Sequence, residues 1–383
     1  MAKNIVICCD GTNNKFGLCN TNVVRLTQVA EQDSNTQLVY YDPGVGTLPE
    51  PGALTAFAKR FSEVKALAFG TDIESKVATA YAHLMEVWEP GDPVFLFGFS
   101  RGAYTARVLA ALLHSLGLLP PGNAHLLPYV MRIFASLRGK PKDSSEYWKL
   151  CNSFRWTFAR PIPGREDRRF PVHFVGVWDT VASVGWVWNP ASYPYTHSNP
   201  SVEIVRHAVA IDERRWFFRQ NLFGNVPGQD TKELWFAGVH SDVGGGYPES
   251  KGGVWRVAFE WMLEEARQNG LRVDQSRLDR VRNRSPLPDN PWAEPKQESL
   301  EGVMWSIAEY VPKRVYDPAT NKQKWGIGAR GYRFVHEGAE LDGSVLRRLR
   351  LGSYNPPNLA KGFVARVKAL TVVPDQMAYH ADQ

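Results

Sequence analysis

The chain has 383 residues, of which 44% are hydrophobic and 22% charged, and its formal net charge is +6. This is the composition of an ordinary globular protein, long enough for one large α/β domain with insertions. The Lys and Arg residues are scattered and are not interleaved with aromatic residues, which argues against a nucleic-acid partner.

The cysteines and the apolar runs indicate the cellular compartment in which the protein is expected. The four cysteines show no CxxC spacing, and Cys8 and Cys9 lie in the first apolar run, so we expect buried, reduced thiols. That run, Ile5–Cys9, is too short for a signal peptide. No run reaches the roughly 18 apolar residues that a bilayer-spanning helix needs. We therefore expect a cytoplasmic protein, whose export would have to proceed without a cleaved signal peptide.

Short apolar runs alternate with longer helical patterns, which is typical of a mostly parallel sheet flanked by helices. The predicted strands are Ile5–Cys9, Leu38–Tyr41, Val94–Phe99, Val172–Trp178 and Leu234–Val239. The predicted helices are Asn22–Gln32, Thr71–Trp88, Arg101–Leu116, Val202–Phe223 and Val254–Asn269. In open α/β sheets, ligands bind at the carboxyl ends of the strands.

Two segments interrupt this alternation, residues 118–171 and residues 274–330. The first contains Pro120-Pro121 and the basic cluster Arg165–Arg169, and the second is polar and rich in proline. We interpret both as insertions in a single domain of residues 1–383. They either cover the cleft as a cap or form surface structure.

The most informative motif lies where the third predicted strand ends. The apolar run enters Gly98-Phe99-Ser100-Arg101-Gly102, and a helix-forming stretch follows at once. Gly-x-Ser-x-Gly at a strand-to-helix junction is the layout of a nucleophile elbow, which presents a serine hydroxyl on a tight turn. The alternative is an ordinary turn whose serine caps the helix. The flanking strand and helix favour the elbow.

A nucleophilic serine needs a histidine to take its proton and a carboxylate to orient that histidine. Asp179 follows one predicted strand, and His240 lies where another runs into a glycine-rich loop. In elbow hydrolases the chain order is serine, acid, histidine, so we predict the triad Ser100, Asp179 and His240. Asp242 is the competing acid and His336 the competing base.

An acyl-transfer site also needs N–H donors aimed at the oxyanion. We expect one donor to be the N–H of Arg101, directly after the elbow, and the second to come from Gly11 or Thr12 after the first strand. Asp10 would then anchor this first loop or pair with Arg101.

Other polar residues give weaker signals. A metal site formed by Asp10 with Asp179 or Asp242 is the weaker interpretation, and we expect no cofactor. His207 and Asp212 fall on the fourth predicted helix, where a structural role is favoured.

Four segments together resemble the DUF2235 family, which includes the Tle1-type phospholipase effectors of type VI secretion systems: Cys9–Asn14, Gly98–Ala103, Gly176–Val181 and Gly238–Tyr247. The resemblance spans about residues 4–270. It implies an α/β-hydrolase fold, a triad carried by Ser100, Asp179 and His240, and phospholipase A activity as in the effector branch. The chain is more compact than that branch, with little room for its large membrane-anchoring insertions.

We therefore predict a serine hydrolase that cleaves carboxylic esters, with lipid or phospholipid acyl esters as substrates, through an acyl-enzyme intermediate. A basic surface is compatible with a peripheral contact with an anionic membrane, which the composition alone does not show. Two alternatives remain: a catalytically degenerate hydrolase fold acting as a binding or regulatory module, and an esterase for small soluble or polymeric esters. The sequence does not indicate an oligomeric state.

Overall fold

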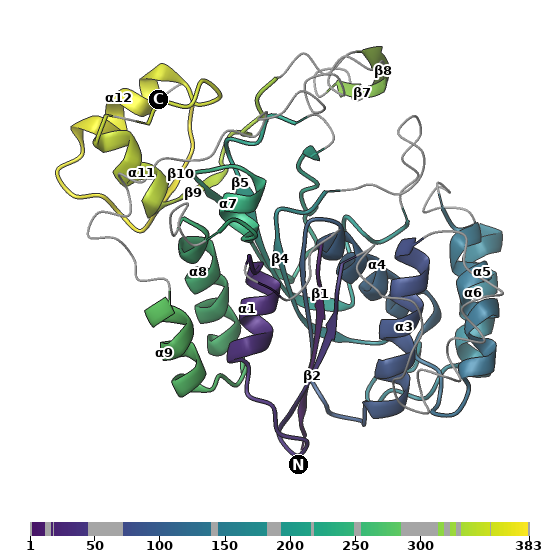
Figure 1. Cartoon of the computed structure of the whole chain (residues 1–383). Helices are drawn as coiled ribbons and strands as arrows, with labels where there is room; N and C mark the ends of the chain where they lie inside the picture. The colour runs from purple at the N-terminus through teal and green to yellow at the C-terminus, as the bar shows by residue number, and fades with distance from the viewer. Residues whose placement is uncertain are drawn as a thin grey trace.

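A central sheet organises the molecule. The computed structural model describes residues 2–11, 17, 19–44, 72–138, 145–181, 193–215, 218–248, 254–284, 331–352 and 354–381, and the backbone of 313–317 and 322–326. Within these residues the sheet has eight strands in the order β10-β9-β6-β5-β4-β3-β1-β2. Neighbouring strands are parallel, except that β10 runs antiparallel to β9. The expected α/β architecture, a mostly parallel sheet flanked by helices, is confirmed (Figure 1).

The inner strands are buried because helices cover both faces of the sheet. Both β1 and β3 are buried along their whole length, which is why they read as continuous apolar runs. The strands of the sheet are β1 (Asn4–Cys9), β2 (Gln37–Asp42), β3 (Val94–Phe99), β4 (Val172–Trp178), β5 (Val202–Ala210), β6 (Asp230–Phe236), β9 (Glu340–Asp342) and β10 (Gln376–Ala378). A separate antiparallel pair consists of β7 (Lys313–Asp317) and β8 (Lys322–Gly326).

The helices form a layer on each side of the sheet (Figure 1). One side carries α3 (Asp72–Val87), α4 (Arg101–Leu116), α5 (Leu127–Ser136) and α6 (Ser145–Phe158), with the short 3-10 helix η1 (Ala124–Leu126) before α5. The other side carries α1 (Asn22–Val29), α8 (Trp255–Gln268) and α9 (Gln275–Arg284). The five-residue helix α7 (His240–Gly244) lies beyond the end of β6, and α11 (Gly343–Arg350) and α12 (Lys361–Ala369) belong to the C-terminal segment.

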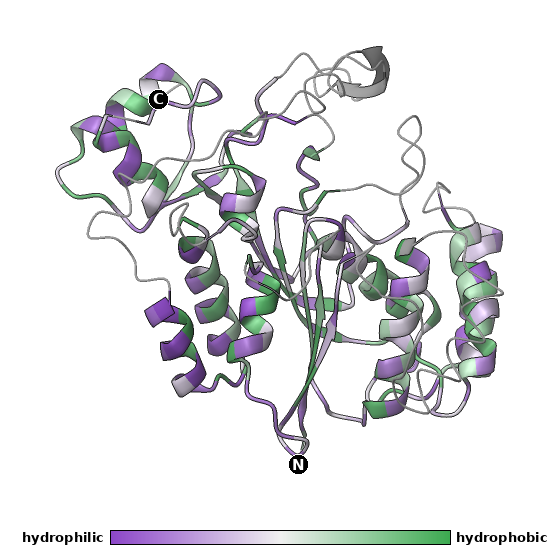
Figure 2. Cartoon of the chain, in the orientation of Figure 1, coloured by the Kyte–Doolittle hydropathy of each residue, from purple (hydrophilic) through white to green (hydrophobic). Residues whose placement is uncertain are grey.

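Alternate side chains of β3 fill the two cores. Val94 and Leu96 pack among α3, α4 and α5, whereas Phe95, Phe97 and Phe99 pack on the side of α1 and α8. The outer helix α9 is mostly hydrophilic in Figure 2, in keeping with its single buried residue, Leu278. Both faces of the sheet are therefore packed against helices. This packing fixes the position of the edge at which the strands end.

One predicted element is wrong. The predicted helix Val202–Phe223 begins instead as the strand β5, which pairs in parallel with β4 on one side and β6 on the other. Four of its nine residues are β-branched, and these favour a pleated, buried strand over a helix. His207 consequently lies within the sheet, and Asp212 lies two residues beyond the end of the strand.

The two interrupting segments differ in how much of them is described. Within the first segment, α5 and α6 pack against α3 and α4 on the outer side of that layer. Of residues 274–330, the structure describes 274–284, which contain α9, and the backbone of β7 and β8. Their interpretation as insertions or cap segments of a single domain stays a prediction.

The cysteines are all free, but not all are buried. Cys8, Cys9 and Cys151 are buried as expected, whereas Cys19 is exposed, which corrects the expectation for that residue. Cys19 lies in the loop after β1, where no strand or helix of the described residues covers it. Among the described helices, none combines the length and the apolar character that crossing a bilayer requires.

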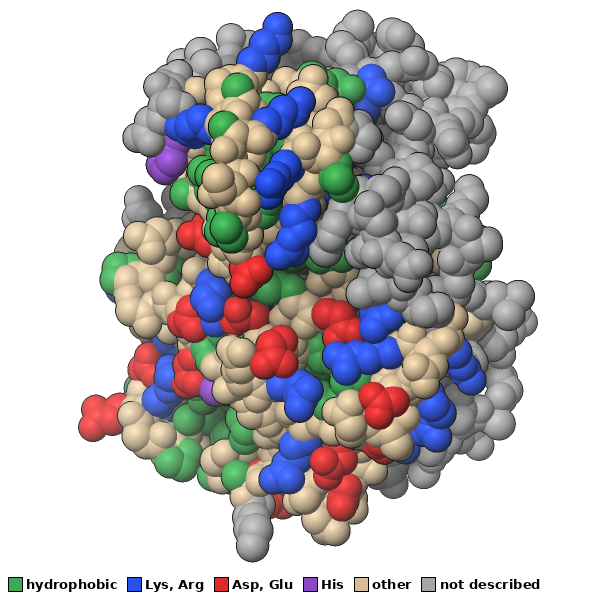
Figure 3. Space-filling view, turned by 90° about the vertical axis from the view of Figure 1, so that its left-hand side faces the viewer, with side chains coloured by type: hydrophobic (Ala, Val, Ile, Leu, Met, Phe, Trp, Pro, Cys, Tyr) green, Lys and Arg blue, Asp and Glu red, His purple; other side chains and the backbone are tan. Residues whose placement is uncertain are grey.

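The C-terminal segment packs on the far edge of the sheet. Its apolar residues form a third cluster with Val209 of β5 and Trp235 of β6. Figure 3 views the molecule from this side: Lys and Arg side chains gather over the C-terminal helices, whereas acidic and basic side chains mix over the helices below. The basic residues of α11 and α12 include Arg347, Arg350, Lys361, Arg366 and Lys368.

Burial of β3 predicts a specific stability effect. Leu96 has no exposed surface, so Leu96→Ala should lower the free energy of unfolding by about 2–5 kcal/mol through lost burial and the cavity left behind. The matched control is Leu351→Ala, because Leu351 is 52% exposed and should cost less than about 0.5 kcal/mol. Urea unfolding of the three proteins measures both effects, and equal costs would contradict this account of the core.

Candidate active site

Ser100 lies on a strained turn between β3 and α4. Its φ of 59° falls in the left-handed region, which non-glycine residues rarely adopt. The backbone N–H of Ser100 donates to the Trp178 carbonyl of β4 at 3.1 Å, which holds the turn against the neighbouring strand. The side chain is nearly buried, with 7% of the residue exposed. The turn thus has the backbone geometry expected of an elbow.

The two glycines of the motif are required by close backbone packing. A Cβ on Gly102 would lie 2.2 Å from the Cys9 carbonyl oxygen of β1, and one on Gly98 would lie 2.5 Å from the Gly102 carbonyl oxygen. Both contacts are with backbone atoms, which have little freedom to move aside. The first turn of α4 therefore approaches the ends of β1 and β3 more closely than any side chain permits.

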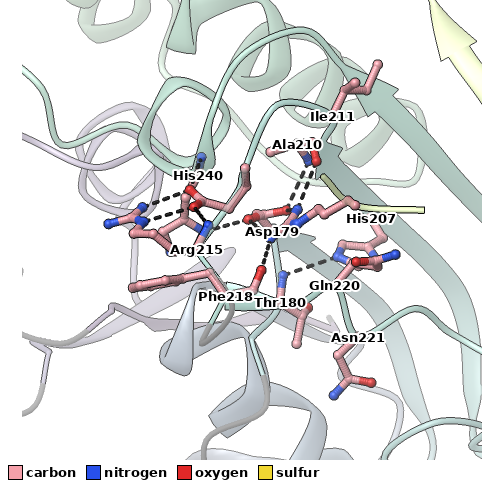
Figure 4. Close-up of polar contacts among 12 residues, drawn as sticks. Asp179, Thr180, His207, Ala210, Ile211, Arg215, Phe218, Gln220, Asn221 and His240 are labelled. Atoms are coloured by element: carbon pink, nitrogen blue, oxygen red, sulfur yellow. Dashed lines mark hydrogen bonds and ion pairs between the residues drawn. The ribbon is translucent and has the colours of Figure 1, made fainter. Parts of the chain in front are cut away.

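Asp179 and His240 are hydrogen-bonded to each other. Asp179 directly follows β4 with a φ of 39°, and His240 is the first residue of α7. The His240 Nδ1 lies 2.5 Å from the Asp179 Oδ2, and Figure 4 shows Asp179 between His240 and Ala210. Asp179 is fully buried and His240 is 4% exposed. The structure thus brings together the predicted acid and the predicted base.

The ring of His240 lies beside the elbow. Its centroid is 4.5 Å from that of the Phe99 ring and 4.8 Å from that of the Phe218 ring. Since Phe99 directly precedes Ser100, this packing puts the imidazole next to the strand end that carries the serine. Two aromatic rings also limit the orientations open to the imidazole, in addition to its bond with Asp179.

Arg333 is a site residue that the sequence did not reveal. Its Nη1 and Nη2 donate to the two carboxylate oxygens of Asp179, at 2.5 and 2.9 Å, and Arg333 itself is 5% exposed. Burial alone would raise the pKa of Asp179, but the Arg333 guanidinium and the hydrogen bond with His240 hold that pKa well below its usual range. Arg333 lies in no recognisable motif, so no local signal could have found it.

A second carboxylate–arginine pair supports the backbone of His240. The buried Glu213 accepts the His240 backbone N–H at 3.2 Å, and Arg215 binds both Glu213 oxygens, at 2.9 and 2.8 Å. Burial opposes ionisation of Glu213, but Arg215 lowers its pKa. Asp212 supports the preceding loop, since its Oδ2 accepts the Gly238 N–H at 2.7 Å. Gly238 is needed there because its φ is +115°.

His207 supports the backbone just after Asp179. Its Nε2 accepts the Thr180 N–H at 3.2 Å, and its Nδ1 lies 2.7 Å from the Glu233 Oε2 (Figure 4 shows the first contact). An accepting Nε2 requires the proton on Nδ1, which then donates to Glu233. These contacts agree with a structural role for His207, although it lies on a strand and not on a helix.

The first loop differs in part from the expected oxyanion arrangement. The Gly11 N–H donates to the Asp10 Oδ1 at 2.7 Å, so in this structure it does not point into the site. The other Asp10 oxygen accepts from the Thr21 and Tyr41 hydroxyls, at 2.8 and 2.9 Å, so Asp10 anchors the loop. Thr12 lies outside the described residues. The N–H of Arg101, at the start of α4, stays the predicted donor.

The competing acid and base have other partners. The Asp242 Oδ2 accepts the Val239 N–H at 3.0 Å, which orders the loop that carries His240. His336 packs against Trp235, with 6.2 Å between ring centroids, beside the C-terminal apolar cluster. Within the described part of the chain, no cluster of three or more His, Cys, Asp or Glu side chains has the arrangement of a metal site.

Comparison with known proteins identifies the family. A model of the family described as "T6SS, Phospholipase effector Tle1-like, catalytic domain" matches residues 3–265. The chain belongs to this Tle1-like family. The resemblance inferred from the four sequence segments is thereby confirmed.

The individual relatives are longer than this chain. The uncharacterized protein YEL023C of Saccharomyces cerevisiae is 34% identical over 233 residues, which are 59% of this chain and 33% of the yeast protein. An uncharacterized protein from Pseudomonas aeruginosa is structurally similar with a TM-score of 0.42 and 17% identity, over 92% of this chain and 53% of that one. The Tle1 effector bound to the VgrG spike gives a TM-score of 0.32 and 20% identity, over 64% and 52%. The chain thus spans about a third of the yeast relative and about half of the two solved structures.

The buried charge of Asp179 predicts a pH-dependent stability. At pH 7, Asp179→Asn should lower the free energy of unfolding by about 3–5 kcal/mol, because the buried Arg333 loses its anion. The folded pKa of Asp179 is depressed, so the stabilisation by its charge is complete above the unfolded value of about 4 and is lost as the pH falls through the folded value. The difference between wild type and variant should therefore narrow below about pH 4.

Urea unfolding between pH 7 and pH 3 measures this difference. The control is Asp230→Asn, which removes a carboxylate with a 53% exposed side chain from Arg206 and leaves Glu265 as its partner. Its effect at pH 7 should be smaller. A stability difference between wild type and the Asp179→Asn variant that stays constant down to pH 3 would show that the charge of Asp179 is not what stabilises this site.

Proposed function

We propose that the chain is a serine hydrolase that cleaves carboxylic esters, with Ser100 as nucleophile, His240 as general base and Asp179 as the residue that orients His240. The observation that carries the proposal is the 2.5 Å contact between the His240 Nδ1 and the Asp179 Oδ2, next to a serine on a left-handed elbow turn. Ser100, Asp179 and His240 follow β3, β4 and β6, and this chain order of serine, acid and histidine is typical of elbow hydrolases.

Acylation follows from this arrangement. The Ser100 Oγ attacks the ester carbonyl carbon while the His240 Nε2 takes the hydroxyl proton. The carbonyl electron pair moves onto oxygen, where the Arg101 N–H at the start of α4 stabilises the resulting oxyanion. When the intermediate collapses, the bond to the leaving alkoxide breaks, and the alkoxide takes the proton from His240. An ester of Ser100 and the acyl group remains.

Deacylation repeats these steps with water as the nucleophile. His240 takes a proton from water, the hydroxide attacks the acyl carbon, and the released Ser100 oxygen recovers the proton. Asp179 accepts the Nδ1–H throughout, which leaves Nε2 free to accept and return protons. Its negative charge also stabilises the imidazolium that forms in both halves of the reaction.

The substrate class rests on the family. The family description names phospholipase effectors, which favours lipid acyl esters, and phospholipids first, over small soluble or polymeric esters. The same description names a type VI secretion system, and export without a cleaved signal peptide stays a prediction for this chain.

Replacing the nucleophile tests the chemistry. Ser100→Ala should lower the hydrolysis of p-nitrophenyl butyrate and of phospholipid vesicles at least about 10³-fold, because no acyl-enzyme forms. A fluorophosphonate probe should label the wild type at Ser100 and leave the variant unlabelled. Ser115→Ala is the matched control, since Ser115 is a buried serine near the other end of α4 that takes no part in the site, and it should retain activity.

The outcomes separate the alternatives. Labelling at Ser100 with hydrolysis of short esters but not of phospholipids would retain the hydrolase and reject the lipid substrate. A folded wild-type protein that does not react with the probe and cleaves neither p-nitrophenyl butyrate nor phospholipids would instead be a binding module. Full activity in Ser100→Ala would overturn the mechanism.

A peripheral contact with anionic membranes is the second part of the proposal. The basic residues of α11 and α12 gather on one face in Figure 3, and two apolar residues of the same segment, Leu351 and Val372, are 52% and 78% exposed. Basic side chains near an anionic surface each contribute about 1 kcal/mol. This face is therefore suited to a lipid surface.

Charge reversal tests the contact. Replacing Arg350, Lys361 and Lys368 together by Glu should weaken binding to phosphatidylglycerol vesicles at least about 100-fold, because three favourable charges become unfavourable. Co-sedimentation measures the binding, with phosphatidylcholine vesicles as the neutral control. Hydrolysis of soluble p-nitrophenyl butyrate should not change. Equal binding by both proteins would exclude this face as the membrane contact.

A further inference from the structure

Arg333 forms a bidentate ion pair with Asp179. The Nη1 lies 2.5 Å from the Asp179 Oδ1 and the Nη2 lies 2.9 Å from the Oδ2, so the guanidinium and the carboxylate face each other in parallel. Such a pair fixes the plane of the carboxylate as well as its position. Nη1 also donates to the Ala210 carbonyl at 2.9 Å, and Nη2 donates to the Phe218 carbonyl.

The donors to Asp179 are divided between its two oxygens. Oδ1 accepts from Arg333 and from the Ala210 N–H, which lies at 3.0 Å, whereas Oδ2 accepts from Arg333 and from His240. With Oδ1 held by two donors, the carboxylate cannot rotate without losing both of them. Oδ2 is therefore kept directed at the imidazole.

The position of Arg333 is itself fixed by neighbouring contacts. The Asn358 Nδ2 donates to the carbonyls of Arg333 and Ile211, each at 3.1 Å. The Phe334 carbonyl accepts from the Gln220 Nε2 at 3.0 Å. The segment that carries Arg333 is thus attached to the loop after β5, so the guanidinium is not placed by Asp179 alone.

We propose that Arg333 is a positioning residue for the ester hydrolysis proposed above: it orients Asp179 toward His240, and its charge sets the pH range in which His240 acts as the base. The proposal rests on the proposed function. It assigns a role to a residue that lies outside the matched residues 3–265.

The electrostatic part of this role follows because the positive charge of Arg333 offsets the negative charge of Asp179. An unpaired carboxylate beside an imidazole favours its protonated form, and a guanidinium on that carboxylate weakens the effect. The same holds for the second carboxylate close to His240, because Glu213 is paired with Arg215. Asp242, two residues along α7, directs its Oδ2 to the Val239 N–H. Arg333 is thus the cation that offsets the negative charge directly bonded to the base.

Removal of this cation should change the pH profile in a defined direction. In Arg333→Gln the negative charge of Asp179 is no longer offset, so His240 is protonated at a higher pH. The acid limb of kcat/KM should therefore move up by about 1 pH unit. At pH 7 we expect kcat to fall roughly 10- to 100-fold with little change in KM, because Asp179 is no longer held in plane.

Arg333→Lys separates orientation from charge. The ammonium keeps the positive charge but cannot form the parallel pair. Its acid limb should stay within about 0.3 pH unit of the wild type, while kcat still falls. Arg206→Gln is the control for a lost buried arginine, since Arg206 is 2% exposed and binds Asp230 and Glu265, which lie outside the site. This control should lose stability and keep the wild-type pH profile.

The experiment measures hydrolysis of p-nitrophenyl butyrate by the full chain from about pH 5 to about pH 9. This range spans the titration of an ordinary histidine. Circular dichroism checks that each variant is folded. A folded Arg333→Gln protein with the wild-type acid limb and kcat overturns the inference. If that variant does not fold, wild-type kcat in Arg333→Lys overturns it instead. Failure of the proposed function looks different, because the wild-type protein would then not be labelled by a fluorophosphonate at Ser100, and the positioning role would fail with it.

Discussion

Asp179 is a carboxylate with no exposed surface, so its ionised form has to be stabilised by the protein alone. The groups that stabilise it come from distant parts of the chain: a backbone N–H at the end of β5, the imidazole of α7 and the guanidinium of Arg333. Each is held by contacts of its own. This one buried charge is therefore stabilised by three features of the fold. They are the sheet order that places β5 beside β4, the loop before α7 and the attachment of the C-terminal segment.

A second constraint acts on the backbone around Ser100. The left-handed turn is compatible with the fold only because Gly98 and Gly102 allow α4 to approach the ends of β1 and β3. The same close approach fixes the position of the first turn of α4, which directly follows Ser100. The proposed nucleophile and the proposed oxyanion donor, the Arg101 N–H, therefore depend on the same close packing.

Local patterns explain why part of the site could be predicted. Ser100, Asp179 and His240 each lie near the end of an apolar run, and Ser100 and His240 lie beside glycines, so the residues and their chain order were visible in the sequence. Interactions over long sequence separation were not visible. Arg333 reaches Asp179 across 154 positions of the chain without a motif of its own.

The errors have equally physical causes. The segment from Val202 has apolar residues at spacings that fit either a helix or a strand. Pairing with β4 and β6 stabilises the strand. The direction of the Gly11 N–H depends on the rotamer of the neighbouring Asp10 side chain, which no sequence pattern encodes.

The place of Arg333 in the chain bears on where the catalytic unit ends. The family model ends at residue 265, yet the cation that neutralises the buried acid is contributed well beyond it, at residue 333. A fragment cut at the end of the matched region would keep the serine, the acid and the base, but it would carry an uncompensated charge in its interior. For this chain, the boundary drawn by sequence similarity thus leaves out a residue that directly contacts the buried carboxylate within it.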